Sequence, residues 1–327
     1  MSITSSLSSA LSGLTVAARA AEVVSSNIAN AMTEGYGRRE LQTAARVVGS
    51  SGQGVQVTGV LRQVDPILLG DRRLAEAGSG GRNATADFLK RLERVIGTPD
   101  SANSLGSSIA AFDTALIDAA SRPESEPRLA RVATTAKSVA SYLATTSDDI
   151  QTARSAADNR IESEVAQVNN ALLRVADING QIRVSSGNGH DVSALEDQRQ
   201  QVIDDISQII PLREVPRGNG QIALFSAGGA VLLDGSPATL GFVPVGMIVP
   251  GMTQGSGALS GLTINGKPVA TGDAGVVSGG SLAGHFAVRD DLGPQAQAQL
   301  DALARDLTER FSDPALDISR APGTAGL

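Results

Sequence analysis

Residues 1–30 read MSITSSLSSALSGLTVAARAAEVVSSNIAN, and the interpretation of the whole chain depends on this stretch. Its apolar residues recur every seven positions in two series offset by four, which is typical of a helix in a coiled coil. This seam consists of Ile3, Leu7, Ala10, Leu14, Ala17, Ala21, Val24 and Ile28. A helix of this length is marginally stable alone in water, so we expect the seam to pack against another helix. An ordinary amphipathic core helix would show the same pattern.

The residues after this stretch carry a longer motif. Residues 26–38 read SNIANAMTEGYGR, in which two asparagines and a glycine are suited to ending the helix. The motif resembles the N-terminal signature of the bacterial flagellar axial proteins, which reads approximately N-N-I-A-N-A-N-T-P-G-Y-S-R. Met32, Glu34 and Gly37 depart from it, and Glu34 in place of the usual proline predicts a less rigid turn. The resemblance implies a joint made by Asn27, Asn30, Gly35 and Tyr36.

The composition argues against several classes of protein and of binding site. The chain has 327 residues and a formal net charge of −7, so nucleic acid is not an expected partner. Only 2% of residues are aromatic, which predicts slim helix packing through Ala, Val, Leu and Ile. Cysteine is absent, which excludes disulfides and thiolate sites. The sequence has no apolar run long enough to insert in a membrane, and its N-terminus lacks the pattern of a cleaved signal peptide.

Residues 38–121 predict two strands followed by helices. Residues 38–64 contain two alternating apolar stretches around a Gly/Ser loop, which predicts two strands. A helix is expected to begin near Pro66. Gly78-Ser79-Gly80-Gly81 lacks the spacing of a phosphate-binding loop and predicts a kink or break in that helix. A helical stripe follows over 103–121.

The longest predicted element is a helical rod from about residue 125 to 184. Apolar steps of three and four continue through it, which predicts a helix of roughly 90 Å. We expect Leu143, Ile150 and Leu172 to face the helix over 103–121 or the one that follows. That following helix is predicted from 193 to about 210, antiparallel to the rod, with Ser193 and Glu196 as a capping box.

Residues 212–281 predict a small β domain inserted between helices. Sixteen of these seventy residues are glycine, and Asn-Gly and Asp-Gly pairs provide hairpin turns. We expect this domain to be removable without unfolding the helices. A helix returns at about Leu282 and carries an apolar stripe to Phe311, and residues 313–327 predict a loop.

Two further blocks narrow the resemblance to one family. Residues 195–207, LEDQRQQVIDDIS, resemble the L-x-D-Q-R-x-x-L-x-D-x-[IL]-S helix of the hook–filament junction proteins, the first hook-associated proteins (FlgK). Residues 284–305 resemble the returning helix of the same family. The fold class is therefore α+β, mainly α, and elongated. Four parts are expected: the inner-tube helix and joint over 1–35, a hairpin connector over 36–64, a helical domain over 65–211 plus 282–327, and the β domain over 212–281.

The resemblance also implies a function and partners. It implies a structural protein at the junction between hook and filament, exported through the flagellar type III system without a cleaved signal, and extracellular in its final place. Its expected partners are copies of itself, the hook protein, the second hook-associated protein and an export chaperone. Since no heptad stretch follows Phe311 to cover the N-terminal seam, we expect the native chain to continue beyond Leu327.

Two alternatives stay open at this point. Another flagellar axial protein, from the hook or rod, would share the N-terminal motif but lack the helical stretch over 101–210. A soluble enzyme with paired carboxylates would need Asp204, Asp205 or His285 in a deep polar pocket. The sequence contains only two histidines, His190 and His285, in no zinc motif, and we predict no catalytic residue, metal or cofactor.

Overall fold

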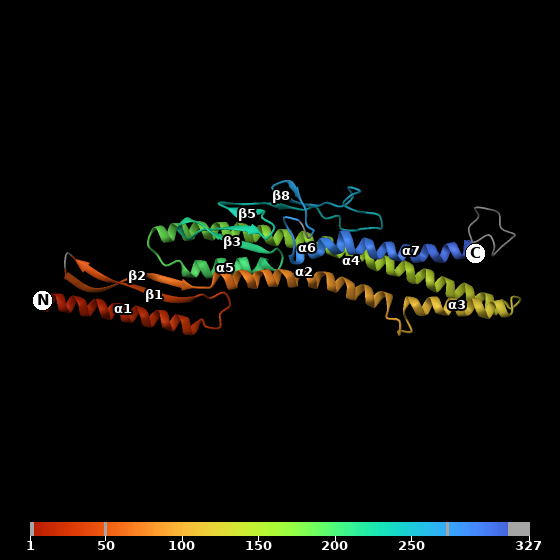
Figure 1. Cartoon of the computed structure of the whole chain (residues 1–327), viewed down its shortest axis with the longest axis horizontal. Helices are drawn as coiled ribbons and strands as arrows, with labels where there is room; N and C mark the ends of the chain where they lie inside the picture. Colours follow the sequence, from red (N-terminus) through yellow and green to blue (C-terminus); the bar gives the residue numbers. More distant parts are fainter. Residues whose placement is uncertain (1–2, 49–50, 273–274, 313–327) are drawn as a thin grey trace.

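The N-terminal end of the molecule is a helix packed on a hairpin (Figure 1). It is seen in a computed structural model that describes residues 3–48, 51–272 and 275–312. The helix α1 (Ile3–Ala29) runs without interruption over the predicted heptads. It lies on an antiparallel pair of strands, β1 (Arg38–Val48) and β2 (Ser51–Gln63). The predicted strands within 38–64 are thereby confirmed.

The next helix, α2 (Pro66–Ile96), is continuous. Of the kink or break predicted at the glycine cluster, the break is therefore wrong. Asp65 caps its start by accepting hydrogen bonds from the amides of Ile67 and Leu68. The glycines serve instead to bring backbones close together. A Cβ on Gly80 would lie 2.6 Å from the carbonyl oxygen of Gln208, and one on Gly81 would lie 2.9 Å from that of Gly280. Glycine costs a helix about 1 kcal/mol relative to alanine, and the surrounding helical turns and tertiary contacts absorb that cost.

Two further helices build the far end of the molecule. The short helix α3 (Leu105–Ser121) folds back along α4 (Glu126–Gly187), the 62-residue rod predicted from the apolar spacing. α4 extends over most of the length of the molecule (Figure 1). A core cluster joins Leu105 to Ile150, with Leu143 packed against it, as predicted.

The helix α5 (Ser193–Ser207) returns antiparallel to α4, which confirms its predicted place. Leu172 of α4 shares a core cluster with Val202 and Ile206 of α5. The predicted capping box is wrong, because helical geometry begins at Ser193 and the N-cap position is Val192.

Asp191 explains the difference. Its carboxylate accepts a hydrogen bond from the hydroxyl of Ser193 at 2.7 Å and another from the amide of Ser193 at 2.9 Å. The serine hydroxyl therefore donates to the charged carboxylate of Asp191, and it does not accept a hydrogen bond from the amides of the first helical turn.

The segment after α5 forms two small antiparallel sheets. The first sheet contains β3 (Leu212–Pro216), β4 (Ile222–Ser226), β5 (Val231–Asp234) and β6 (Ser236–Pro237). The second contains β7 (Leu240–Gly241), β8 (Leu262–Ile264) and β9 (Lys267–Val269). The predicted Asn-Gly turns are present. Asn219, in the short turn η1 (Gly218–Gly220), and Asn265, between β8 and β9, both have left-handed backbone angles.

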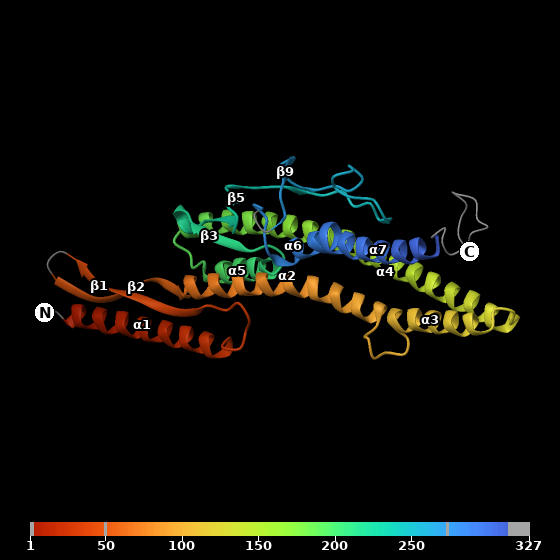
Figure 2. The same ribbon diagram turned by 45° about the vertical axis from the view of Figure 1, so that its right-hand side comes forward.

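Side chains of α4 hold this β segment by acting as strand partners. Asn169 accepts from the amide of Leu240 and donates to its carbonyl oxygen, both at 2.8 Å. Asn179 makes the same pair of bonds with Ile222. The β segment thus lies along α4, on the side away from α2 (Figure 2). Most of its buried apolar residues belong to the same core cluster as α4 and α5.

The chain returns along α4 in one nearly continuous helical run. It consists of α6 (Gly280–Ala287), a π-helical turn η2 (Val288–Leu292) and α7 (Gly293–Ser312). The predicted stripe is confirmed at Leu303, which packs into the α3–α4 cluster, and at Phe311, whose ring lies 5.4 Å from that of Phe112. The loop predicted over 313–327 lies outside the described residues.

The architecture confirms the predicted class, an elongated and mainly helical α+β fold with small antiparallel sheets. In the described part of the chain, none of the helices is both long and apolar enough to cross a membrane. The division into four parts remains a prediction.

Candidate assembly interface

The predicted seam of α1 faces solvent along its whole length. Ile3 is 89% exposed, Leu14 is 69% exposed and Ile28 is 73% exposed. The other seam residues are exposed as well: Leu7, Ala10, Ala17, Ala21 and Val24. Apolar side chains this large usually lie in a core, and a contiguous exposed row of them marks an interaction surface.

A different face of α1 is used within the chain. Val16, Ala20 and Val23 are half-buried, and this face packs on the hairpin. The hydroxyl of Ser12 accepts a hydrogen bond from the amide of Val55 at 3.2 Å, where Gly54 lets the strand approach the helix. The hairpin therefore leaves the heptad stripe uncovered.

Two of the predicted joint residues, Asn27 and Tyr36, meet at the end of α1. The side-chain oxygen of Asn27 accepts from the Tyr36 hydroxyl and from the Arg39 amide, both at 2.9 Å. Its side-chain nitrogen donates to the carbonyl oxygen of Arg39 at 2.8 Å, so Asn27 pairs with β1 as a neighbouring strand would. Asn30 instead bonds back to the carbonyl oxygen of Ser26 and stays within the helix end.

A residue that the sequence did not single out completes the joint. The carboxylate of Asp197, on α5, accepts from the amide of Gly37 at 2.8 Å, from Arg62 Nε at 2.6 Å and from Arg39 Nη2 at 3.3 Å. Its partners lie at least 135 residues away in the chain. Asp197 belongs to the L-E-D-Q-R block, and that resemblance was the only signal in the sequence that could have pointed to it.

Two glycines allow close contacts at the joint, Gly35 with α5 and Gly37 with Arg62 of β2. Gly35 has a φ of +78°, and a Cβ there would lie 2.5 Å from Cγ of Gln201. A Cβ on Gly37 would lie 2.5 Å from Nε of Arg62. The Gln201 amide also donates to the carbonyl oxygen of Glu34 at 2.7 Å. The predicted joint residue Gly35 is therefore held against α5.

A second polar cluster ties the β segment to the helices at the π-helical turn. Arg289 and Asp158 form an ion pair at 2.7 Å, and neither side chain is exposed. Arg289 also pairs with Asp290, and its guanidinium lies 5.3 Å from the ring centroid of Phe242 and 4.9 Å from that of Phe286. Burial acts to lower the pKa of Arg289, but hydrogen bonds to the two carboxylates outweigh it and raise the pKa.

Arg154 extends this cluster toward the loop after β7. It donates to the carbonyl oxygens of Arg289 at 2.8 Å and Met252 at 2.6 Å. Burial lowers the pKa of the Arg154 guanidinium, with the nearby positive charge of Arg289 adding to the effect and Asp290 opposing it. Both arginines thus satisfy buried backbone and carboxylate oxygens, which is a structural use of charge.

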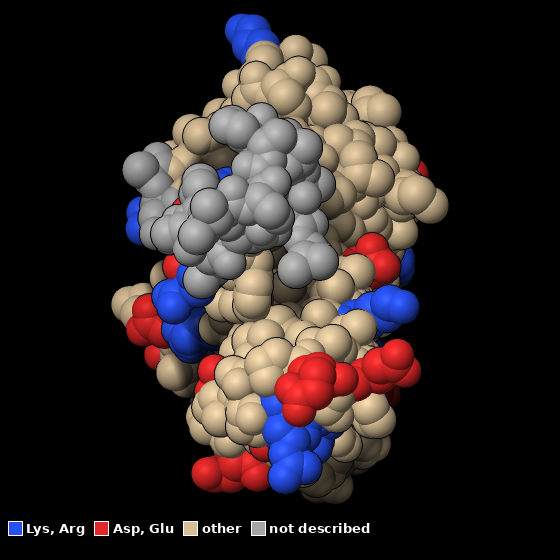
Figure 3. Space-filling view, turned by 90° about the vertical axis from the view of Figure 1, so that its right-hand side faces the viewer, with Lys and Arg blue, Asp and Glu red and all other residues tan. Residues whose placement is uncertain are grey.

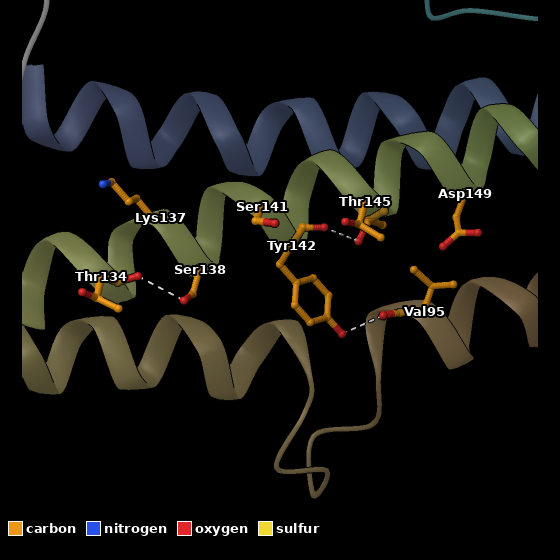
Figure 4. Close-up of a pocket in the computed structure, with 9 residues that line it drawn as sticks. Val95, Thr134, Lys137, Ser138, Ser141, Tyr142, Thr145 and Asp149 are labelled. Carbon is orange, nitrogen blue, oxygen red and sulfur yellow. Dashed lines mark hydrogen bonds between the residues drawn. The ribbon is translucent and has the colours of Figure 1, made fainter.

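A groove with a volume of about 700 Å³ lies along α4, near the loop between α2 and α3 (Figure 4). Hydroxyl side chains from successive turns of α4 line it, with Lys137 and Asp149 as its charged residues. The Tyr142 hydroxyl donates toward the carbonyl oxygens of Val95 and Asn103, and so it ties together the two ends of the loop between α2 and α3.

The residues considered for catalysis lie elsewhere. Asp204 pairs with Arg72 and Arg73, and His285 lies 3.5 Å from Glu164. Neither Asp204, Asp205 nor His285 lines the groove. Within the described residues, no three His, Asp or Glu side chains gather in a way that could hold a metal ion.

Surface charge is mixed at the end of the molecule near the α3–α4 turn. In Figure 3, blue and red side chains alternate over a mostly uncharged surface, and neither sign covers a continuous area. Ion pairs such as Arg131 with Asp118 account for part of this mixture.

Comparison with protein families identifies the chain. Residues 89–315 match the model of the flagellar hook-associated protein FlgK helical domain, and residues 7–36 match that of the flagella basal body rod proteins. The chain belongs to the FlgK family of flagellar hook-associated proteins.

Curated relatives agree with the FlgK assignment. The chain is 29% identical to flagellar hook-associated protein 1 of Salmonella typhimurium over 243 residues, which is 72% of this chain and 44% of that protein. It is 27% identical to the proteins of the same name from Escherichia coli and Bacillus subtilis, again over 72% of this chain. The chain spans about half the length of the curated relatives it matches.

The fold also agrees with the FlgK family. The flagellar hook junction protein FlgK from Burkholderia pseudomallei superposes with a TM-score of 0.60 at 21% identity, covering 74% of this chain and 43% of that one.

Proposed function

We propose that this chain is a structural protein of the bacterial flagellum that joins the hook to the filament. The observation that carries the proposal is the exposed heptad stripe of α1 in a chain of the FlgK family. In the proposed role, the stripe packs against other terminal helices to form the inner tube. The hairpin, the helical domain and the β segment then lie progressively further outward.

The chemistry of the stripe suits such packing. Burying a Leu or Ile side chain contributes roughly 1.5–3 kcal/mol, and the large seam residues are still mostly exposed. Alanines between them, at Ala10, Ala17 and Ala21, let a partner helix approach closely. The expected partners are therefore helices with apolar heptads, in neighbouring copies of this chain, the hook protein and the second hook-associated protein.

Export and place in the cell follow from the same proposal. We propose that the chain leaves through the flagellar type III system without a cleaved signal, accompanied by an export chaperone, and works outside the cell. A hook or rod protein is the second candidate, supported by the rod-protein match over residues 7–36. The helical-domain match over residues 89–315 favours the junction protein.

Microscopy of a deletion strain tests the proposed role. Cells without the gene should carry hooks without filaments and shed flagellin into the medium. Complementation with Leu7→Lys should fail, because a charge would enter the packed seam, whereas Ser8→Lys adds the same charge outside the seam and should restore filaments. Intact filaments on the deletion strain would refute the junction role, and full complementation by Leu7→Lys would refute the seam.

A further inference from the structure

The N-terminal unit, which we define as α1 with the β1–β2 hairpin (residues 3–63), has little packing against the rest of the molecule. Within the described residues, α1 packs substantially only on β1 and β2, and outside this unit the main packing partner of β2 is α5. No large core cluster spans this boundary. The direction of α1 relative to the helical domain must therefore be fixed by a few specific contacts.

Most of those contacts converge on the carboxylate of Asp197, and the Gln201 side chain adds one hydrogen bond to the carbonyl oxygen of Glu34. Asp197 is largely buried, and it accepts from a backbone amide that follows α1 and from one arginine on each strand of the hairpin. The arginine on β2, Arg62, also donates to the side chain of Gln200 on the next turn of α5. A carboxylate that accepts three donors from three segments holds those segments in one relative position, because charged hydrogen bonds are short and directional.

Two residues after Asp197, the same helix is bound to the rest of the fold through Arg199. Arg199 donates to the carbonyl oxygen of Gly220 at 2.7 Å and to the side chain of Asn179 at 2.9 Å, so it joins α5 to α4 and to the turn after β3. Burial lowers the pKa of Arg199. Because Asp197 stands on a helix fixed in this way, it provides a rigid anchor for the N-terminal unit.

We infer that Asp197 is a positioning residue that sets the direction in which α1 leaves the helical domain. Without it, the N-terminal unit would swing on the segments around Gly35 and Val64, while the helical domain stays folded. The consequence for assembly rests on the proposed function, because a seam can pack in a regular tube only if every copy presents it in the same direction.

Spin-label distances test this inference in the full chain. Because the sequence has no cysteine, Ser6→Cys on α1 and Asn170→Cys on α4 introduce two unique, exposed labelling sites. Dilution with unlabelled protein removes contributions from contacts between copies through the seam. The unaltered chain should give a single narrow distance distribution, and Asp197→Ala should replace it with a broad one.

Asp205→Ala is the matched control, since Asp205 is an exposed aspartate on the same helix, and it should keep the narrow distribution. If Asp197→Ala loses its helical circular dichroism, Arg62→Ala takes its place, because it removes the shortest bond to Asp197 from the hairpin side. A narrow distribution in the folded variant would overturn the inference.

The seam variant separates this inference from the proposed function. Leu7→Lys should leave the distance distribution narrow, since it does not touch the Asp197 contacts. A broad distribution for Asp197→Ala, together with full complementation by Leu7→Lys in cells, would retain the positioning role and refute the seam. A narrow distribution for Asp197→Ala, together with failed complementation by Leu7→Lys, would refute the positioning role alone.

Discussion

The glycine cluster of α2 permits a sharp test of the close backbone contact between α2 and the start of α6. Gly80→Ala and Gly78→Ala make the same chemical change two residues apart on one helix. On helix propensity alone, each should stabilise the protein by about 1 kcal/mol. Their surroundings differ: a Cβ on Gly78 would meet only the guanidinium of Arg82, at 3.4 Å or more, whereas one on Gly80 would lie 2.6 Å from the carbonyl oxygen of Gln208.

The expected magnitude follows from that distance. The carbonyl oxygen of Gln208 accepts a hydrogen bond from the amide of Ser281 at 2.9 Å, so moving it strains the junction of α5 and α6. Overpacking costs about 1–3 kcal/mol, and weakening the hydrogen bond adds up to about 1 kcal/mol. After the propensity gain of about 1 kcal/mol, Gly80→Ala should lower the free energy of unfolding by up to about 3 kcal/mol, whereas Gly78→Ala should raise it by about 1 kcal/mol.

Urea unfolding followed by helical circular dichroism measures both changes. Gly70→Ala is a second control on α2, since a Cβ there would contact nothing within 4 Å, and it should also stabilise. If Gly80→Ala raised the urea midpoint as much as Gly78→Ala does, the backbones of α2 and the α5–α6 junction would not be in close contact. The role assigned here to the glycine cluster would then be wrong.

Two further predictions concern the interior. Asp158→Ala leaves the buried Arg289 with Asp290 as its remaining carboxylate, and it leaves the Val245 amide without its acceptor. It should lower the free energy of unfolding by about 3 kcal/mol, the low end of the range for breaking a buried pair, whereas Asp234→Ala removes an exposed carboxylate and should leave the urea midpoint almost unchanged. Equal midpoints for the two variants would contradict the buried-pair assignment. A deletion that joins Ile210 to Leu282 should lose helical circular dichroism beyond the deleted residues, because the β segment shares one core cluster with α4 and α5. This result would be contrary to the expectation from sequence. A helical signal that falls only in proportion to the deleted length would refute this prediction.

Local periodicity was sufficient to predict most of the elements. The heptads of α1, the rod of α4 and the strands of the hairpin all occur where the spacing of apolar residues placed them. This succeeds because a helix or strand that buries one face must repeat its apolar residues with its own period. The sequence predicted the heptad seam itself, whereas its exposure within this chain is seen only in the structure, because a buried core helix would carry the same spacing.

Contacts between distant segments decided what the sequence left open. The glycines of α2 weaken a helix locally, and only the approach of Gln208 and Gly280 shows why they are compatible with a continuous one. Ser193 fits a capping box by spacing, but Asp191 engages its hydroxyl. Asp197 carries no periodic signal, because its three partners come from segments that only the folded chain brings together. Periodicity reports which face of an element is buried, whereas the choice of partner for a polar side chain depends on three-dimensional proximity, and only the tertiary structure supplies that.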